Sequence, residues 1–371
     1  MNNEDGVVER ALKSSRDPRV FRTLLDLVKR TVGFLQKKPV LMEVCGSHTW
    51  AISHTGIRNL LKDEVELISG PGCPVCVTSS GEITQMVELS YIPGVIIASY
   101  GDMMRVPARR GTLETSRAAG NRIEVVYSAV DAVNIAETNP ARQVVFLGIG
   151  FETTAPATAV AVELAQSRRL ENFTVYSVHK LMPPALRAIL TLPALNVDGL
   201  ILPGHVSTVT GKNYFNFVSD YGVPAVIAGF EPCDILYAIL RLVEKIRLRD
   251  SAVENAYSRA VRDDGNIRAM AKMTKMFRPS DAFWRGLGSI PQSGLALDPR
   301  YSSFDARVRF GLPPAVEEPE PPGCNCAAVL SGRKTPPQCG LFGKSCTPSN
   351  PVGPCMVSSE GSCRAYYLSS Q

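Results

Sequence analysis

Three thiols and one imidazole give the first hundred residues most of their chemical interest. Cys45 and His48 fall in the segment MEVCGSHT, and Cys73 and Cys76 form a C-x2-C spacing in GPGCPVC. Thiolates and imidazoles suit soft metal ions, and a C-x2-C pair at a helix start can instead be a redox pair with a lowered pKa. The sequence predicts a soft-metal or redox site here, with simple packing of small cysteine side chains as the alternative.

A second group of thiols lies near the carboxyl end. Its pattern is C-x-C-x12-C-x6-C-x8-C-x7-C, formed by Cys324, Cys326, Cys339, Cys346, Cys355 and Cys363. Four thiolates can hold a [4Fe–4S] cluster while the other two form a redox pair, which accounts for all six. A structural zinc site needs only four thiolates, and disulfides require an oxidising compartment. We predict an iron–sulfur cluster, with a zinc-stapled knot as the alternative.

Composition and charge exclude several classes of protein. The chain has 371 residues, of which 45% are hydrophobic and 20% charged, as in globular proteins. The net charge of +5 is modest and the Lys and Arg residues are dispersed, so we expect no nucleic-acid binding. We find no signal peptide, membrane span or P-loop pattern, so we expect a cytoplasmic protein with any nucleotide bound by a partner.

Short apolar runs alternate with amphipathic segments along the middle of the chain. The runs are residues 40–45, 65–70, 94–100, 122–128, 143–149, 173–178, 197–202 and 223–230. Such runs are typical of strands buried on both faces of a parallel sheet, and the alternation predicts βαβ units. The predicted fold class is α/β: two similar open parallel-sheet lobes plus a small Cys-rich [4Fe–4S] domain packed with terminal helices. Ligands bind beyond the carboxyl ends of such strands, so we expect the site in a cleft between the lobes.

We expect five parts along the chain. They are N-terminal helices (1–38), a lobe with the CGSH and CPVC motifs (39–130), a lobe with the GFETTAP and PGHVS motifs (131–232), a helical and linker region (233–322) and an iron–sulfur domain (323–371). Within the fourth part, the pattern predicts long helices first and then a loop-rich stretch that ends in the stiff connector PPAVEEPEPP.

Two further motifs follow predicted strands. GFETTAP predicts a helix start capped by Thr153 or Thr154, with an anion or a partner carboxylate at that helix end as the alternative. PGHVS places His205 beyond a strand end, where an imidazole can ligate a metal, transfer protons or cap a helix.

Together these motifs resemble the HypD family of [NiFe]-hydrogenase maturation proteins. The resemblance rests on MEVCGSHT, GPGCPVC, GFETTAP, LPGHVS and the tail motifs CNC, CGLFGKSC and GPCMVSSEGSC, and it covers nearly the whole chain. It implies two α/β lobes and a [4Fe–4S] domain. It also implies a scaffold and redox centre for assembling the Fe(CN)2CO group of the hydrogenase, in a transient ternary complex with a HypC-type chaperone and a HypE-type cyanide donor.

The resemblance also implies roles for single residues. Cys45 would hold the iron together with a chaperone cysteine, with His48 and His205 as further iron candidates. Cys73 and Cys76 would be the redox pair beside it. In the tail, the family's likeness to ferredoxin–thioredoxin reductase maps the cluster ligands to Cys324, Cys339, Cys346 and Cys363, and a second redox pair to Cys326 and Cys355. Cys355 and Cys363 can exchange roles in this assignment, and Glu360 is a candidate proton relay.

One departure from the family pattern is a single residue in the motif that begins with Cys45. The family usually shows CGSHTH, and Trp50 stands here in place of the second histidine.

Two other functions fit the same thiols. One is a stand-alone iron–sulfur thiol–disulfide reductase, and the other is a zinc-stapled adaptor. The implied activity is assembly of a metallocofactor on a scaffold rather than simple turnover.

Overall fold

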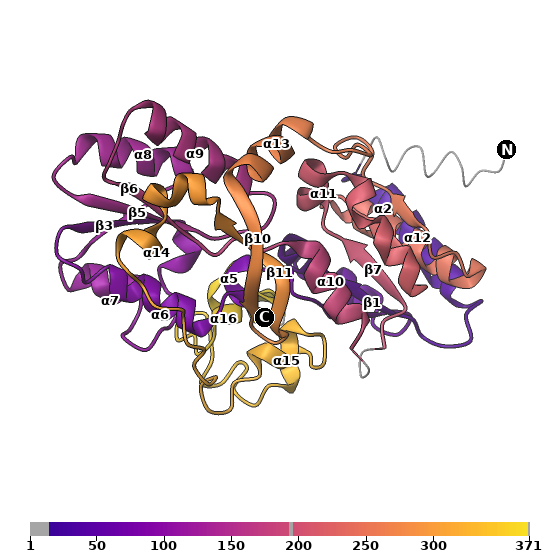
Figure 1. The fold of residues 1–371 in the computed structure, drawn as a ribbon. Coiled ribbons are helices and arrows are strands. Elements are labelled where there is room, and N and C mark those ends of the chain that lie inside the picture. The colour runs from indigo at the N-terminus through magenta and orange to yellow at the C-terminus, as the bar shows by residue number, and fades with distance from the viewer. Residues whose placement is uncertain (1–14, 193–195, 370–371) are drawn as a thin grey trace.

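Two parallel sheets form the centre of the molecule (Figure 1). The structure is a computed structural model and describes residues 15–192 and 196–369. The first sheet has the order β2-β1-β7-β8-β9, with β1 Val40–Glu43, β2 Glu66–Ser69, β7 Gly199–Leu202, β8 Ala225–Ile227 and β9 Val253–Asn255. The second has the order β4-β3-β5-β6, with β3 Val95–Ser99, β4 Arg122–Val125, β5 Gln143–Gly148 and β6 Phe173–Ser177. Within both sheets the paired strands run parallel, which confirms the predicted α/β class.

The strands are distributed between the two sheets differently from the sequence prediction. The expected boundary at residues 130 and 131 falls between β4 and β5, which lie in the same sheet. Strand β1 pairs with β2 on one side and with β7 on the other, so the chain leaves the first sheet after β2 and returns at β7. The prediction of two lobes consecutive in sequence is therefore wrong. Buried parallel strands all read as apolar runs, so the runs alone do not specify which strands pair.

Helices cover the sheets and connect the strands. The α-helices are α2 Pro18–Val32, α3 Gly46–His54, α4 Ile57–Leu60, α5 Pro74–Val77, α6 Ser80–Leu89, α7 Leu113–Ala118, α8 Ala129–Thr138, α9 Ala155–Ser167, α10 Met182–Leu190, α11 Gly204–Thr210, α12 Pro232–Leu248, α13 Ile267–Met276, α14 Ala306–Arg309, α15 Cys326–Leu330, α16 Pro354–Val357 and α17 Ser362–Ser369. The described residues also form 3-10 segments η1 Gly101–Met103, η2 Lys212–Tyr221, η3 Pro299–Phe304 and η4 Pro336–Gln338. In the described part of the chain, no helix is both long and apolar enough to cross a membrane.

The predicted N-terminal helix is present as α2. Asp17 caps it, because its carboxylate accepts a hydrogen bond from the Arg19 amide at 2.7 Å. Leu24 and Val28 are fully buried in the cluster that also contains residues of α12, against which α2 packs. The first 14 residues of the predicted helical part lie outside the described residues.

A β-hairpin occupies the first part of residues 278–322, a stretch predicted to be loop-rich, whereas residues 313–321 of the connector have no helix or strand. Strands β10 (Phe277–Trp284) and β11 (Gly288–Leu297) pair antiparallel. Trp284 is fully buried, and its indole N–H donates to the Ser293 hydroxyl at 2.9 Å. The hairpin is held by partners elsewhere in the chain, since the Leu181 amide donates to Ser293 O and the Arg285 amide to Val77 O. Local sequence does not reveal such partners, which explains the wrong prediction.

The carboxyl-terminal tail packs against both thiol-bearing turns. Helix α17 contacts α3, which follows β1, and α16 contacts α5, which follows β2. In Figure 1 the tail is yellow, and α16 lies beside α5 near the middle of the molecule. The tail therefore lies at the carboxyl ends of these two neighbouring strands.

Candidate thiol and metal site

Cys45 ends the turn after β1 and begins α3. Its backbone is extended, and its side chain is buried. Burial and, next, the negative charge of Glu360 raise the pKa of the Cys45 thiol to about 12, although amide N–H groups of His48 and Ser47 and the Ser47 hydroxyl hydrogen-bond the sulfur. The thiol is therefore protonated at neutral pH in the metal-free protein, and a bound cation must displace that proton.

The two thiol-bearing turns touch through a glycine. A Cβ added at Gly72 would lie 2.4 Å from both the Cα and the N of Cys45. The Gly46 amide donates a hydrogen bond to Gly72 O at 3.0 Å. Only glycine permits this approach of two backbones, so GPGCPVC requires Gly72 for spacing.

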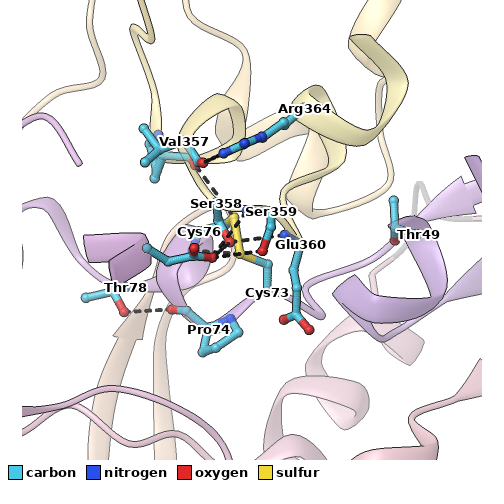
Figure 2. Close-up of a disulfide and its surroundings, with 12 residues drawn as sticks. Thr49, Cys73, Pro74, Cys76, Thr78, Val357, Ser358, Ser359, Glu360 and Arg364 are labelled. Carbon is cyan, nitrogen blue, oxygen red and sulfur yellow. Dashed lines mark hydrogen bonds between the residues drawn. A yellow bond between two sulfur atoms is a disulfide. The ribbon is translucent and has the colours of Figure 1, made fainter. Parts of the chain in front are cut away.

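Cys73 and Cys76 form a disulfide in the second turn (Figure 2). Both residues are buried, and the Cys76 amide donates to the Cys73 sulfur at 3.2 Å. The Cys76 sulfur lies 3.9 Å from the carbonyl oxygen of Pro354, which directly precedes Cys355 in the tail. The pair is thus adjacent to a tail cysteine in space, while its redox role stays a prediction.

Glu360 extends from the tail to the Cys45 turn. Its Oε1 accepts a hydrogen bond from the Ser47 hydroxyl, and a Cβ added at Gly46 would lie 2.5 Å from the Glu360 Cβ. Burial and, more weakly, the charge of Asp102 raise the pKa of the Glu360 carboxyl, against the hydrogen bond from Ser47. The carboxylate is therefore held close to Cys45 in a partly desolvated position.

Asp102 fixes the same tail loop from the second sheet. It follows β3, and its Oδ2 accepts hydrogen bonds from the Ser358 hydroxyl at 2.8 Å and from the amide and hydroxyl of Ser359 at 3.2 Å. Residues 353–361 thus join the strand ends of both sheets.

His48 and His205 both stack on Phe230. Their ring centroids lie 4.7 and 3.9 Å from that of Phe230. His48 is fully buried, and its Nε2–H donates to the carbonyl oxygens of Gly229 at 3.0 Å and Ala228 at 3.3 Å. Burial lowers its pKa to about 4, so the ring is neutral and only Nδ1 has a free lone pair, with no hydrogen-bond partner among the described residues.

His205 is more open to solvent than His48. It is exposed, and its Nδ1 lies 3.3 Å from the Ser47 hydroxyl oxygen. Partial burial lowers the pKa of His205.

Trp50, the departure from the family pattern, contacts a different histidine. Its ring stacks on that of His54, with the centroids 4.7 Å apart, and it lines a separate pocket with Ala365 and Leu368 of α17.

The six tail cysteines line one pocket. Apolar side chains of Leu341, Phe342 and Met356 complete its wall. Within the group, Cys326 hydrogen-bonds with Cys324 and Cys355, and Cys355 also hydrogen-bonds with Cys363. The hydrogen bonds from Cys324 and Cys355 lower the pKa of Cys326, and the hydrogen bonds with Cys326 and Cys363, with burial, raise that of Cys355. The six residues predicted from spacing do come together.

The tail pocket offers thiols, the donor type that an iron–sulfur cluster takes. Among the described residues, no three His, Cys, Asp or Glu side chains are arranged to hold one metal ion. The thiolates of a [4Fe–4S] cluster bind different iron atoms and do not converge on one point. A Cβ added at Gly353 would lie 3.1 Å from the Cys324 sulfur and 3.7 Å from that of Cys326, so this glycine keeps space open beside the thiols. The donor set and this cradle fit the predicted group.

A cavity of about 510 Å³ lies beyond the carboxyl ends of β3, β4 and β5. Its lining includes Pro74 of the C-x2-C turn and Glu360 of the tail. Thr154 also lines it and precedes α9, but the Thr154 side chain does not cap the helix. Its hydroxyl instead donates to Ile149 O at 3.3 Å, so the predicted side-chain cap is wrong at this residue.

Two polar residues of the site were assigned no role from the sequence. Ser47 stands inside the quoted CGSH motif, but serine is also common in first helical turns, so type alone gave no signal. Asp102 follows a predicted strand, and only the folded chain shows that its carboxylate holds the tail loop. Both depend on contacts between segments more than 250 residues apart.

Comparisons with known proteins agree on one family. A family model named HypD, described as the "Hydrogenase formation hypA family", matches residues 19–370. "Hydrogenase maturation factor HypD2" of Bradyrhizobium diazoefficiens is 48% identical over 341 residues, which cover 89% of this chain and 90% of the relative. "Hydrogenase maturation factor HypD" of Azotobacter vinelandii is 48% identical over 335 residues, 88% of each chain. Its Escherichia coli namesake is 43% identical over 339 residues, 91% of each chain.

Proposed function

Because the chain belongs to the HypD family of hydrogenase maturation factors, we propose that it is the scaffold and redox centre on which the Fe(CN)2CO group of [NiFe]-hydrogenase is assembled. Iron is the cargo of this process. The partners are a HypC-type chaperone, which supplies a second cysteine to the iron, and a HypE-type cyanide donor in a transient ternary complex. The compartment is the cytoplasm.

Cys45 is the residue that holds the iron. Its thiol must lose a proton on binding, and the Glu360 carboxylate close by is suited to accept it. A soft thiolate suits low-spin iron that carries cyanide and carbon monoxide. Of the two candidate imidazoles, His205 is exposed and His48 offers only its buried Nδ1, which favours His205 beside the iron.

The tail thiols hold the cluster and exchange disulfides with the C-x2-C pair. Cys324, Cys339, Cys346 and Cys363 are the proposed ligands of a [4Fe–4S] cluster, which would supply electrons one at a time. The thiols of Cys326 and Cys355 then reduce the Cys73–Cys76 disulfide. In this exchange two thiols become a disulfide while the other disulfide becomes two thiols, so two electrons and two protons are transferred. Cys355 contacts both Cys326 and Cys363, so the exchange of roles between Cys355 and Cys363 stays open.

One tail loop carries this proposal. Residues 353–361 contact the disulfide through Pro354, the Cys45 turn through Glu360 and the second sheet through Ser358. The same loop contains Cys355, which lines the cysteine pocket. A single segment therefore links the thiols proposed for electron supply to the thiol proposed for iron binding.

Maturation in cells lacking their own HypD tests the proposal. The wild-type gene is expected to restore [NiFe]-hydrogenase activity, and Cys45→Ala is expected to abolish it. Cys233→Ala is the matched control, because Cys233 is buried in α12 and its sulfur contacts only the Asp17 carbonyl oxygen at 3.7 Å among the hydrogen bonds of the described residues. Restoration by Cys45→Ala at the wild-type level would refute the assigned role.

A stand-alone thiol–disulfide reductase is the second candidate, favoured by the Cys73–Cys76 disulfide itself. Cys73 is 3% exposed and Cys76 is fully buried, so a protein disulfide has little access to either sulfur. Catalytic reduction of a disulfide in another protein, in the absence of any chaperone, would favour this alternative. Dependence of all thiol turnover on the chaperone would exclude it.

A further inference from the structure

The Ser47 hydroxyl joins three segments that are distant in sequence. It donates a hydrogen bond to Oε1 of Glu360 in the tail and lies 3.3 Å from Nδ1 of His205 at the start of α11. Among the described residues, no other hydroxyl hydrogen-bonds both of these side chains.

The hydrogen-bonding capacity of a hydroxyl decides the direction of each contact. A serine hydroxyl has one proton and two lone pairs. The carboxylate of Glu360 can only accept, so the Ser47 proton is directed to it. The remaining lone pairs can only accept, so His205, whose Nδ1 lies 3.3 Å away, must donate its proton from Nδ1. This arrangement requires the proton of neutral His205 to be on Nδ1 and leaves Nε2 with a free lone pair.

No other described contact fixes this choice for His205. Phe230 stacks on the ring at 3.9 Å and holds its plane, but stacking does not distinguish the two nitrogens. His48 is fixed in the opposite way, because its Nε2–H donates to the Gly229 and Ala228 carbonyl oxygens. The two neighbouring imidazoles are therefore expected as opposite tautomers.

We propose that Ser47 is a positioning residue that sets the Nδ1–H tautomer of His205 and fixes the Glu360 carboxylate beside Cys45. It acts through these two side chains rather than on a ligand itself. The inference rests on the proposed function in one respect: iron assembly supplies a metal ion for which the free Nε2 lone pair can be a ligand.

Nitrogen NMR of full-length protein labelled with 15N-histidine reads the tautomers directly. The chain contains four histidines, so each ring pair can be resolved and His205 assigned with a His205→Asn variant. At about pH 8, above the lowered pKa of His205, the ring is neutral. The wild type is expected to show protonated Nδ1 at His205 and protonated Nε2 at His48.

Three variants separate a positioning role from a general loss of structure. Ser47→Ala is expected to lower the ratio of Nδ1–H to Nε2–H at His205 by about tenfold, the effect of one hydrogen bond. Ser47→Thr keeps a hydroxyl and should restore the ratio. Ser53→Ala is the matched control on the same helix, because the buried Ser53 hydroxyl has no hydrogen-bond partner among the described residues. Hydrogen exchange of residues 358–361 should accelerate about tenfold only in Ser47→Ala.

The outcomes decide the inference independently of iron assembly. A wild-type His205 that carries its proton on Nε2, or a Ser47→Ala spectrum identical to that of Ser53→Ala, would overturn it. If Ser47→Ala does not fold, the folded Ser47→Thr variant decides. Loss of the Nδ1–H tautomer of His205 in Ser47→Thr would overturn the inference, and its retention would support it. Because these measurements use metal-free protein, their failure differs from failure of the proposed function, which is read from hydrogenase maturation.

Discussion

Replacing Gly72 with alanine should separate the two thiol-bearing turns. The new Cβ would lie 2.4 Å from Cys45 Cα, whereas ordinary contact begins at about 3.4 Å, so the backbones must part by about 1 Å. Such overpacking costs about 1–3 kcal/mol, and loss of the hydrogen bond from Gly46 to Gly72 costs about 0.5–1.5 kcal/mol more. We therefore expect the free energy of unfolding to fall by about 2–4 kcal/mol.

Thermal unfolding followed by circular dichroism measures this loss. An entropy of about 2.1 cal/mol/K per residue gives the whole chain about 0.8 kcal/mol/K, so Gly72→Ala should lower Tm by about 3–5 °C. Gly101→Ala is the control, since its Cβ meets only Val125 at 3.8 Å, an ordinary contact. Equal Tm values for Gly72→Ala, Gly101→Ala and the wild type would refute the close packing of the two turns.

Three further changes test other parts of the molecule. Gly353→Ala should reduce the iron and sulfide bound per chain because the methyl group fills space beside the tail thiols, whereas Gly340→Ala, which meets nothing within 4 Å, should not; equal contents would contradict the cradle. Arg58→Ala leaves the Glu43 carboxylate buried without its 2.6 Å ion pair, which should cost about 3–5 kcal/mol and lower Tm by about 4–6 °C; an unchanged Tm would show that the pair does not stabilise the fold. Burial raises the pKa of Glu152 from 4.5 to about 7. The contribution of neutral Glu152 to the free energy of unfolding is therefore fully present below about pH 4.5 and is lost as the pH rises through about 7. Glu152→Gln should remove that fall in denaturant titrations between these pH values, and a fall identical to that of the wild type would contradict it.

Local sequence was sufficient for strands β1 to β8 and for the tail thiols, but not for β9, β10 and β11. Each of the eight apolar runs contains a strand of the structure. All of these strands except β4 are mostly buried, and a strand buried on both faces needs continuous apolar residues. The six tail cysteines line one pocket, as expected if they serve one group. Both predictions depended on residue type and spacing within a segment.

Pairing between distant segments could not be predicted in this way. Strand β1 pairs with β7 across more than 150 residues, and the β10–β11 hairpin is held by the segment after β6. The same limit applies to the site, where Ser47 and Glu360 are 313 residues apart. Apolar patterning specifies which face is buried, but it does not name the partner that buries it.

Infrared spectroscopy of the anaerobically purified protein with its HypC-type chaperone tests the central claim most directly. We expect cyanide and carbonyl stretching bands in the wild-type complex and in Cys233→Ala. Cys45→Ala should lack these bands, because the complex loses the thiolate proposed to hold the iron. Unchanged bands in Cys45→Ala would contradict the assignment of Cys45 as the iron holder.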